Sequence, residues 1–226
     1  MNQLLNSLPA ADLSRITPHL RHVPLRSRQT VLRQGEPIQE IIFPTGGVCS
    51  LLKTMEDGHT IEIMAVGAEG AIGTGVAMGQ ADSATDVVVQ IPHDAALALP
   101  VDVFRAEMQA QGALWSAIGE YSSQMTLQLM QASACNALHS ADKRCCRWLL
   151  TADDRLQSER LPVTQEMLAV LLGIRRPTVT LIMAELQRAG IVDYARGSLA
   201  VRDRASLIAR ACECYRALSP GLRKVA

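Results

Sequence analysis

The stretch TQEMLAVLLGIRRPTVTLIMAELQRAG, residues 164–190, predicts two short helices joined by a tight turn at Gly173. In the second helix, apolar residues follow the i, i+3, i+4, i+7 spacing of one buried stripe: Val179, Ile182, Met183 and Leu186. Side chains that can reach phosphates or base edges begin its opposite face: Arg175, Arg176, Thr178 and Thr180. A major groove accepts such a helix, but an ordinary helical hairpin in a protein core is the alternative. The flanking sequence has to decide between them.

The composition favours a globular protein with an aliphatic core. Of the 226 residues, 48% are hydrophobic and only 3% aromatic, enough for one large or two modest domains. No apolar run approaches the length of a membrane span, and the N-terminus MNQLLNSLPAADLSR lacks the basic region of a signal peptide. Six cysteines without the spacing of a disulfide scaffold favour reduced thiols in a cytoplasmic protein without a membrane partner.

The net charge of zero hides an asymmetry between the two parts of the chain. Residues 1–139 hold 7 basic against 13 acidic residues, a net charge of −6. Residues 140–226 hold 15 basic against 9 acidic residues, a net charge of +6. A basic C-terminal part that contains the helix pair is typical of a nucleic-acid-binding protein, although a solvated basic face would look the same.

The N-terminal part predicts short helices followed by many short strands. Residues 4–20 suit one or two helices broken by Pro9 and Pro18. Turn residues then separate β-type runs: QTVLRQG, QEIIFP, GVCSLLKTM, HTIEIMAVG, TDVVVQI and AALAL. Asp57-Gly58 between two of these runs is a hairpin signal. This pattern indicates a sandwich or small barrel, which can enclose one small ligand.

A helical period returns after Pro100. Residues 103–111 predict a short helix that ends at Gly112, and residues 113–138 predict a long one. Apolar residues follow a roughly heptad stripe along the long helix: Leu114, Ile118, Tyr121, Met125, Leu129 and Ala132. Ala117, Leu127 and Met130 add a second apolar edge. One edge can cover the β domain while the other pairs with a second copy, so we expect a homodimer; burial within its own chain is the alternative.

The C-terminal part predicts a winged helix-turn-helix. Residues 139–142 suit a hinge. Residues 143–156 predict a helix with Trp148, Leu149 and Leu156 facing inward, and residues 161–163 predict a short strand. Beyond Gly190, residues 191–194 and 198–201 predict two strands that turn at Arg196-Gly197. This hairpin is a wing that can place Arg196 on a DNA backbone. Residues 205–218 predict a last helix.

These motifs together resemble the CRP/FNR family of bacterial transcription regulators over nearly the whole chain. RQGEPIQEIIFPTGGVCSLL, DGHTIEIMAVG and EGAIG are similar to the glycine-marked roll of that family, and LPVTQEMLAVLLGIRRPTVT, LQRAGIVDY and RGSLAVRDRASL to its C-terminal domain. The resemblance implies an α+β protein with a cupin-like β-roll in residues 1–112, a dimerisation helix and hinge in 113–139, and a winged helix-turn-helix in 140–226. It also implies a homodimer on a palindromic operator, with double-stranded DNA and RNA polymerase as partners.

The resemblance also assigns roles to individual residues. Thr164 and Gln165 open the first helix, where the family contacts the DNA backbone, and Arg176 falls where the family places an arginine on guanine. The other implied DNA-binding residues surround these: Arg175, Pro177, Thr178, Thr180, Leu181 and Arg196. Two of them depart from the family, since Pro177 replaces an acidic residue and Leu181 a second reading arginine. Because proline disfavours helical geometry in the residue before it, we expect the reading helix (176–189) to begin at Pro177, with Arg176 as its cap.

The implied effector pocket departs further from the family. Cyclic-nucleotide binders use a glutamate and an arginine, whereas Thr74 stands near the first position and Ser83-Ala84-Thr85 covers the second. No lysine or arginine lies between Lys53 and Arg105, so a cyclic phosphate would be poorly compensated, although backbone amides of residues 70–75 could cradle an anion. We therefore expect an unidentified signal other than cyclic AMP. The residues assigned to this pocket are Gly70, Gly73, Thr74, Ser83, Thr85, Tyr121 and Met125.

Other functional classes find less support in the sequence. The six cysteines do not match the iron–sulfur motif of the family, and neighbouring helical positions point apart, so we expect buried inert thiols and no metal. A haem- or redox-responsive sensor stays an alternative, with His59, His93 and Cys135 as possible haem ligands, and the cofactor is left open. Gly70–Gly75 lacks the order of a dinucleotide fingerprint and no catalytic cluster is visible, so no enzyme is predicted. A sensor that does not bind DNA is the third alternative.

Overall fold

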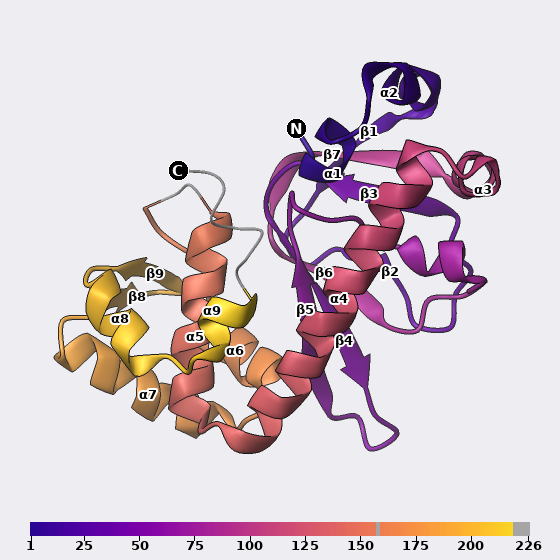
Figure 1. The fold of residues 1–226 in the computed structure, drawn as a ribbon. Helices are drawn as coiled ribbons and strands as arrows, with labels where there is room; N and C mark the ends of the chain where they lie inside the picture. The colour runs from indigo at the N-terminus through magenta and orange to yellow at the C-terminus, as the bar shows by residue number, and fades with distance from the viewer. Residues whose placement is uncertain (157–158, 219–226) are drawn as a thin grey trace. The chain divides into compact units, whose positions relative to one another are not determined.

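The computed structural model describes residues 1–156 and 159–218, which form two compact units (Figure 1). The first unit comprises residues 1–51 and 64–127. The second comprises residues 52–63 together with the described part of the chain from residue 128 onward. This division by packing differs from the three-part division by element that the sequence predicts, and the latter stays a prediction. The α+β fold class with a β-roll, a long helix and a C-terminal helix-turn-helix is confirmed.

The N-terminal helices form as the prolines predict. They are short: α1 (Gln3–Asn6), α2 (Ala10–Ile16) and the 3-10 helix η1 (Thr17–His19). The Asn2 side chain accepts a hydrogen bond from the Leu5 amide and so caps α1, while its own amide group donates to the carbonyls of Pro44 and Gly70. A single buried asparagine therefore ties the start of the chain to the end of one strand, at Pro44, and to the loop at Gly70.

Every predicted β-type run forms a strand of the roll. The strands are β2 (Thr30–Leu32), β3 (Glu40–Pro44), β4 (Val48–Thr54), β5 (Thr60–Val66), β6 (Asp86–Ile91) and β7 (His93–Pro100). One strand, β1 (Arg21–Leu25), was not among the predicted runs. Its Pro24 and largely exposed side chains hide the alternating pattern, and its place at a sheet edge explains why a proline is tolerated there.

The roll encloses an apolar interior between two sheets with the strand orders β1-β7-β3 and β2-β6-β4-β5. Neighbouring strands β1, β7 and β3 are antiparallel. Both sheets contribute side chains to one buried cluster: Leu25, Ile42, Cys49, Met64, Val66, Ile72, Val87, Val89, Ala96 and Ala98. A second cluster joins sheet β1-β7-β3 to the helices and includes Leu5, Phe43, Phe104, Leu114 and Ile118.

The two helices after the roll have nearly the predicted bounds. Helix α3 spans Val101–Ala110 and α4 spans Ala113–Leu138. Gln111, rather than Gly112, takes the left-handed conformation that ends α3. On α4, Leu114 and Ile118 are buried and Tyr121 and Met125 half-buried, whereas Leu127 and Met130 are exposed. No single helix in the described residues is long and apolar enough to cross a membrane.

The second unit contains the winged helix-turn-helix. Its elements are α5 (Ala141–Arg155), α6 (Gln165–Leu172), α7 (Arg176–Arg188), β8 (Val192–Ala195), β9 (Ser198–Val201), α8 (Arg204–Arg210) and α9 (Cys214–Leu218). Trp148 and Leu149 of α5 are buried as predicted, while Leu156 lies at its end and is only half-buried. Leu161 forms an isolated bridge to Leu199, which adds a third short segment to the wing.

The prediction of one last helix over residues 205–218 is wrong. The chain leaves α8 at Ala211 in an extended conformation, and α9 begins again at Cys214. Tyr215 explains the change of direction, because its buried ring brings the hydroxyl within 2.9 Å of both Asp154 Oδ2 and Arg204. Arg204 also pairs with Asp153 and Asp154, so one polar cluster ties α5, α8 and α9 together.

The contact between Gly70 and Tyr121 gives a test of packing in the first unit. A Cβ atom at residue 70 would lie 2.4 Å from Tyr121 Oη, and Tyr121 donates a hydrogen bond to the Ala71 carbonyl. Gly70→Ala should therefore lower the free energy of unfolding by about 1–3 kcal/mol through overpacking. Most of this loss should disappear in a Tyr121→Leu background, as measured by urea denaturation.

Gly119→Ala is the matched control on α4. Nothing lies within 4 Å of a Cβ at residue 119, so alanine there should stabilise the helix by roughly 0.5–1 kcal/mol. Equal destabilisation by Gly70→Ala with and without the tyrosine ring would contradict this packing.

Candidate nucleic-acid interface

The turn between α6 and α7 sets the geometry of the candidate interface (Figure 1). The Thr164 side chain caps α6 by accepting a hydrogen bond from the Met167 amide at 3.1 Å. Gly173 ends α6 with φ +61°, in the left-handed region that glycine adopts at low cost. The axes of α6 and α7 are bent by 115°, within the range of helix-turn-helix pairs. The predicted helix pair is thereby confirmed.

Helix α7 begins at Arg176, with Arg175 as its N-cap. The expected start at Pro177 with Arg176 as the cap is therefore wrong by one residue. The Arg175 carbonyl accepts hydrogen bonds from the amides of Thr178 and Val179, and Arg175 itself has extended backbone angles. Pro177 fits in this first turn because an amide at its position would have no partner within the helix.

The two faces of α7 separate as the apolar spacing predicts. Val179, Ile182, Met183 and Leu186 are buried. Six residues at the N-terminal end of the helix are exposed: Arg175, Arg176, Pro177, Thr178, Thr180 and Leu181. Leu181 is 73% exposed, which is unusual for a leucine beside a packed core. The buried stripe fixes the helix in the domain and leaves the polar N-terminal end available for contact.

Side chains from the start of α6 meet those at the start of α7. The Thr180 hydroxyl donates to Gln165 Oε1 at 2.7 Å, and Arg176 Nε lies 3.7 Å from Glu166 Oε2. Both Arg176 and Glu166 are more than two-thirds exposed, so this long ion pair contributes at most about 1 kcal/mol. Arg176 is thus held loosely and can be redirected when a stronger partner arrives.

The wing brings Arg196 to the same end of the domain. Arg196 and Gly197 form the two-residue connection between β8 and β9, with φ +49° and +78°, as a type I′ turn requires. A Cβ at residue 197 would lie 3.2 Å from Thr164 Cγ2, so the tip of the wing packs beside the N-cap of α6. The structure therefore gathers Thr164, Gln165, Arg176 and the wing tip, which the sequence places in separate segments.

Most other arginines of the second unit have structural partners inside it. Arg204 pairs with two aspartates, and Arg210 Nη1 lies 2.6 Å from Glu185 Oε1. Arg160 pairs with Asp193 at 2.8 Å and Arg144 donates to the Leu172 carbonyl at 3.0 Å. No ion pair to Arg175 or Arg196 is found among the described residues. Arg175 and Arg196 at the α7 and wing end are thus available to meet an anion.

The residues assigned to an effector pocket occupy several places in the roll and on α4. Gly70 contacts the Tyr121 ring, and the Ser83 hydroxyl donates to the Thr85 carbonyl at 2.7 Å. Thr74 is buried at the start of the 3-10 helix η2 (Thr74–Met78), after Gly73 with φ +89°. Met125 packs against the apolar cluster between the two sheets.

A cavity of about 320 Å³ lies elsewhere, along residues 30–42, and its lining includes Arg33, Glu36 and Glu40. None of the residues assigned to the effector pocket lines it. Of the possible haem ligands, His59 is exposed and 3.1 Å from Asp57, and His93 packs its ring near Gly46. Cys135 belongs to a different group of side chains in the second unit.

Comparison with known proteins identifies this architecture. Residues 143–210 match the family model of the Crp-like helix-turn-helix domain. No curated protein matches the sequence.

Several solved structures share the fold at low sequence identity. FixK2 from Bradyrhizobium japonicum is 13% identical, with a TM-score of 0.74, covering 85% of this chain and 98% of its own. The c-di-GMP-responsive regulator CLP from Xanthomonas campestris is 17% identical, with a TM-score of 0.70 and coverages of 85% and 99%. TTHA1359 from Thermus thermophilus, a CRP/FNR-family regulator, is 19% identical, with a TM-score of 0.67 and coverages of 84% and 98%. The chain therefore contains a Crp-like helix-turn-helix domain and has the fold of the CRP/FNR family of transcription regulators.

Proposed function

We propose that the chain is a homodimeric transcription regulator that inserts the N-terminal end of α7 into the major groove of a palindromic operator. One observation carries the proposal: Arg175, Arg176, Thr180 and Leu181 are exposed at the end of a helix whose opposite stripe is buried. The buried stripe removes the freedom of the helix to turn, so the same side chains always face the DNA. Two such helices in a dimer read two half-sites.

The exposed side chains divide into base readers and backbone contacts. Arg176 can donate two hydrogen bonds to guanine, and the exposed Leu181 can pack on a thymine methyl group. Arg196, Thr164 and Thr178 suit phosphates because a guanidinium, a hydroxyl or a helix-start amide binds them without reading sequence. Because Leu181 cannot read guanine, the operator should differ from sites that two arginines read.

The roles of Arg176 and Arg196 can be separated by mutation. Arg176→Ala should cost about 1–3 kcal/mol of discrimination against the wrong base pair while it leaves most non-specific affinity. Arg196→Ala should weaken specific and random DNA alike and reduce the slope of log affinity against log salt by about 1. Fluorescence anisotropy on a promoter fragment and on a scrambled duplex measures both. Identical effects of the two substitutions would overturn the assignment.

Helix α4 carries the surface that we propose for dimerisation. Leu127, Met130 and Leu138 are 64%, 66% and 80% exposed, and no charged residue follows Glu120 on this helix. Residues 127, 130, 134 and 138 follow one another at steps of three or four positions and so lie along one face of the helix, where Ala134 leaves room for close approach. Exposing an apolar, uncharged stripe of this kind to water costs free energy, and pairing with a second copy would remove that cost.

A charge placed in this stripe should separate the dimer. Met130→Lys should shift the protein from dimer to monomer in sedimentation velocity, because two like charges would face each other across the two-fold axis. Met78→Lys is the control, since Met78 is 68% exposed on η2, outside α4. The proposal of a dimer through α4 is contradicted if the unmodified protein sediments as a monomer, or if both variants stay dimeric.

The interior of the roll supports a signal other than a cyclic nucleotide. Its buried cluster is aliphatic, and the chain has no lysine or arginine between residues 53 and 105 to balance a phosphate. We therefore expect no binding heat from cyclic AMP in titration calorimetry, and unchanged affinity for the operator in its presence. A saturable heat at one site per chain would contradict this expectation.

A further inference from the structure

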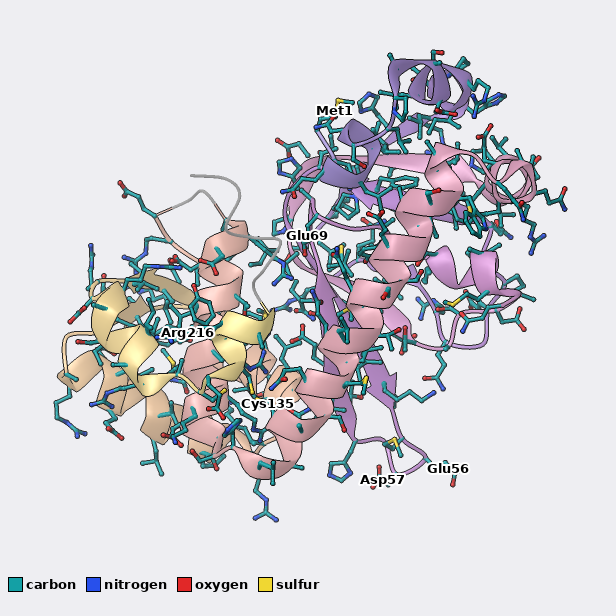
Figure 2. All side chains as sticks on the ribbon, in the orientation of Figure 1. Met1, Glu56, Asp57, Glu69, Cys135 and Arg216 are labelled. Carbon is teal, nitrogen blue, oxygen red and sulfur yellow. The ribbon has the colours of Figure 1, made fainter. Side chains whose placement is uncertain are left out.

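Three cysteines and one histidine meet at the C-terminal end of α4. The ligand atoms of Cys135, His139, Cys212 and Cys214 all lie within 4.8 Å of one another. The three cysteines are buried and the histidine is half-buried. All four residues belong to the second unit. Figure 2 labels Cys135 on α4, in the part of the unit that contains α9.

Local structure explains why these side chains converge. Cys135 and His139 are four residues apart, and the His139 amide continues the helical turn by donating to the Cys135 carbonyl at 3.0 Å. Cys212 lies in the break between α8 and α9, and Cys214 begins α9. Glu213 between them points its side chain outward, 79% exposed, which leaves the two cysteines on the inner side. The resulting pattern is C-x3-H followed by C-x-C.

The cysteines are buried as expected, but the expectation that Cys212 and Cys214 point apart is wrong. It assumed that residues 212 and 214 share a helix and diverge, whereas the break after α8 places Cys212 outside any helix. All six cysteines are free and buried, but Cys49, Cys145 and Cys146 are not part of the group. The i, i+4 spacing of Cys135 and His139 and the C-x-C spacing of Cys212 and Cys214 are the signals that the sequence offers.

The distances suit four ligands around a single ion. Cys135 Sγ and Cys212 Sγ are 3.6 Å apart, and Cys214 Sγ and His139 Nδ1 are 3.5 Å apart. Bonds of about 2.3 Å to sulfur and about 2.0–2.1 Å to nitrogen, arranged as a tetrahedron, place the ligand atoms about 3.6–3.8 Å apart. A [4Fe–4S] cluster binds each thiolate to a different iron, and a [2Fe–2S] cluster divides its four ligands between two irons, so both require a wider arrangement of ligands than a single ion does.

Neighbouring polar groups are placed as supports for metal ligands. His139 Nε2 and Glu213 Oε1 are 3.2 Å apart, so Nε2–H can donate to the carboxylate while Nδ1 faces the three sulfurs. Gln131 Nε2 donates to Cys214 Sγ at 3.0 Å.

We propose that Cys135, His139, Cys212 and Cys214 bind one Zn²⁺ ion in a closed structural site. Four protein ligands leave no open position for a substrate, and three thiolates with one imidazole are a set that zinc takes in structural sites. The ion would join the end of α4 to the segment between α8 and α9. That junction fixes where the winged helix-turn-helix begins after the long helix. Binding should release protons from the thiols and stabilise the fold.

Metal analysis of the full chain tests the proposal independently of DNA binding. The protein is purified without a histidine tag, in reductant, and analysed by mass spectrometry for metals. About one zinc per chain is expected. Cys135→Ala and Cys214→Ala should lose the zinc, and Cys49→Ala, a buried cysteine of the roll, should keep it. Chelation with phenanthroline should lower the melting temperature of the unmodified protein and leave the Cys135→Ala variant unchanged.

Two further measurements keep the test decisive if a variant folds poorly. Cobalt added to the chelated protein should give visible bands of a tetrahedral ion with thiolate charge transfer, and His139→Cys should retain the ion with stronger charge transfer. The proposal is overturned by metal-free protein that does not take up zinc or cobalt. It is also overturned by a Cys135–Cys212 disulfide in non-reducing peptide maps, or by iron with acid-labile sulfide.

Discussion

The turn at Gly173 is the constraint on which the interface depends. A left-handed residue at this position lets α7 leave α6 at 115°, which turns Val179, Ile182, Met183 and Leu186 into the core. Residues 175–178, 180 and 181 then face outward. The same geometry brings the start of α6 beside the wing, through the contact of Gly197 with Thr164. A binding surface thus arises from one permissive backbone position and one buried stripe.

The arginines of the second unit fall into two groups, one that pairs within the unit and one at its exposed α7 and wing end. Arg144, Arg160, Arg204 and Arg210 hold α5, α6, α8 and the wing together through pairs with acidic groups or carbonyls. Arg175, Arg176 and Arg196 lie at the α7 and wing end, where their charge can attract DNA. A zinc ion at Cys135, as proposed, would add a second fixed junction, at the point where α4 meets this domain.

Sequence periodicity predicted most elements because it reflects local rules. The roll strands, the bounds of α4 and the buried stripe of α7 follow from alternation, helical spacing and turn residues. The edge strand β1 was missed because Pro24 masks its pattern, and the break after α8 because the packing of Tyr215 overrides helix propensity. The group of three cysteines and a histidine could not be predicted, since His139 and Cys212 are 73 positions apart in the sequence and only tertiary structure brings them together. The roles of the roll residues as effector ligands stay a prediction.

Selection of bound sequences from a random DNA library tests the central claim most directly. The purified protein should enrich an inverted repeat, with half-site centres about one helical turn apart and a guanine in each half-site. The Arg176→Ala variant should lose the preference for that guanine. Enrichment of no sequence, or of a single unrepeated site, would contradict the reading of α7 as a dimeric DNA-recognition helix.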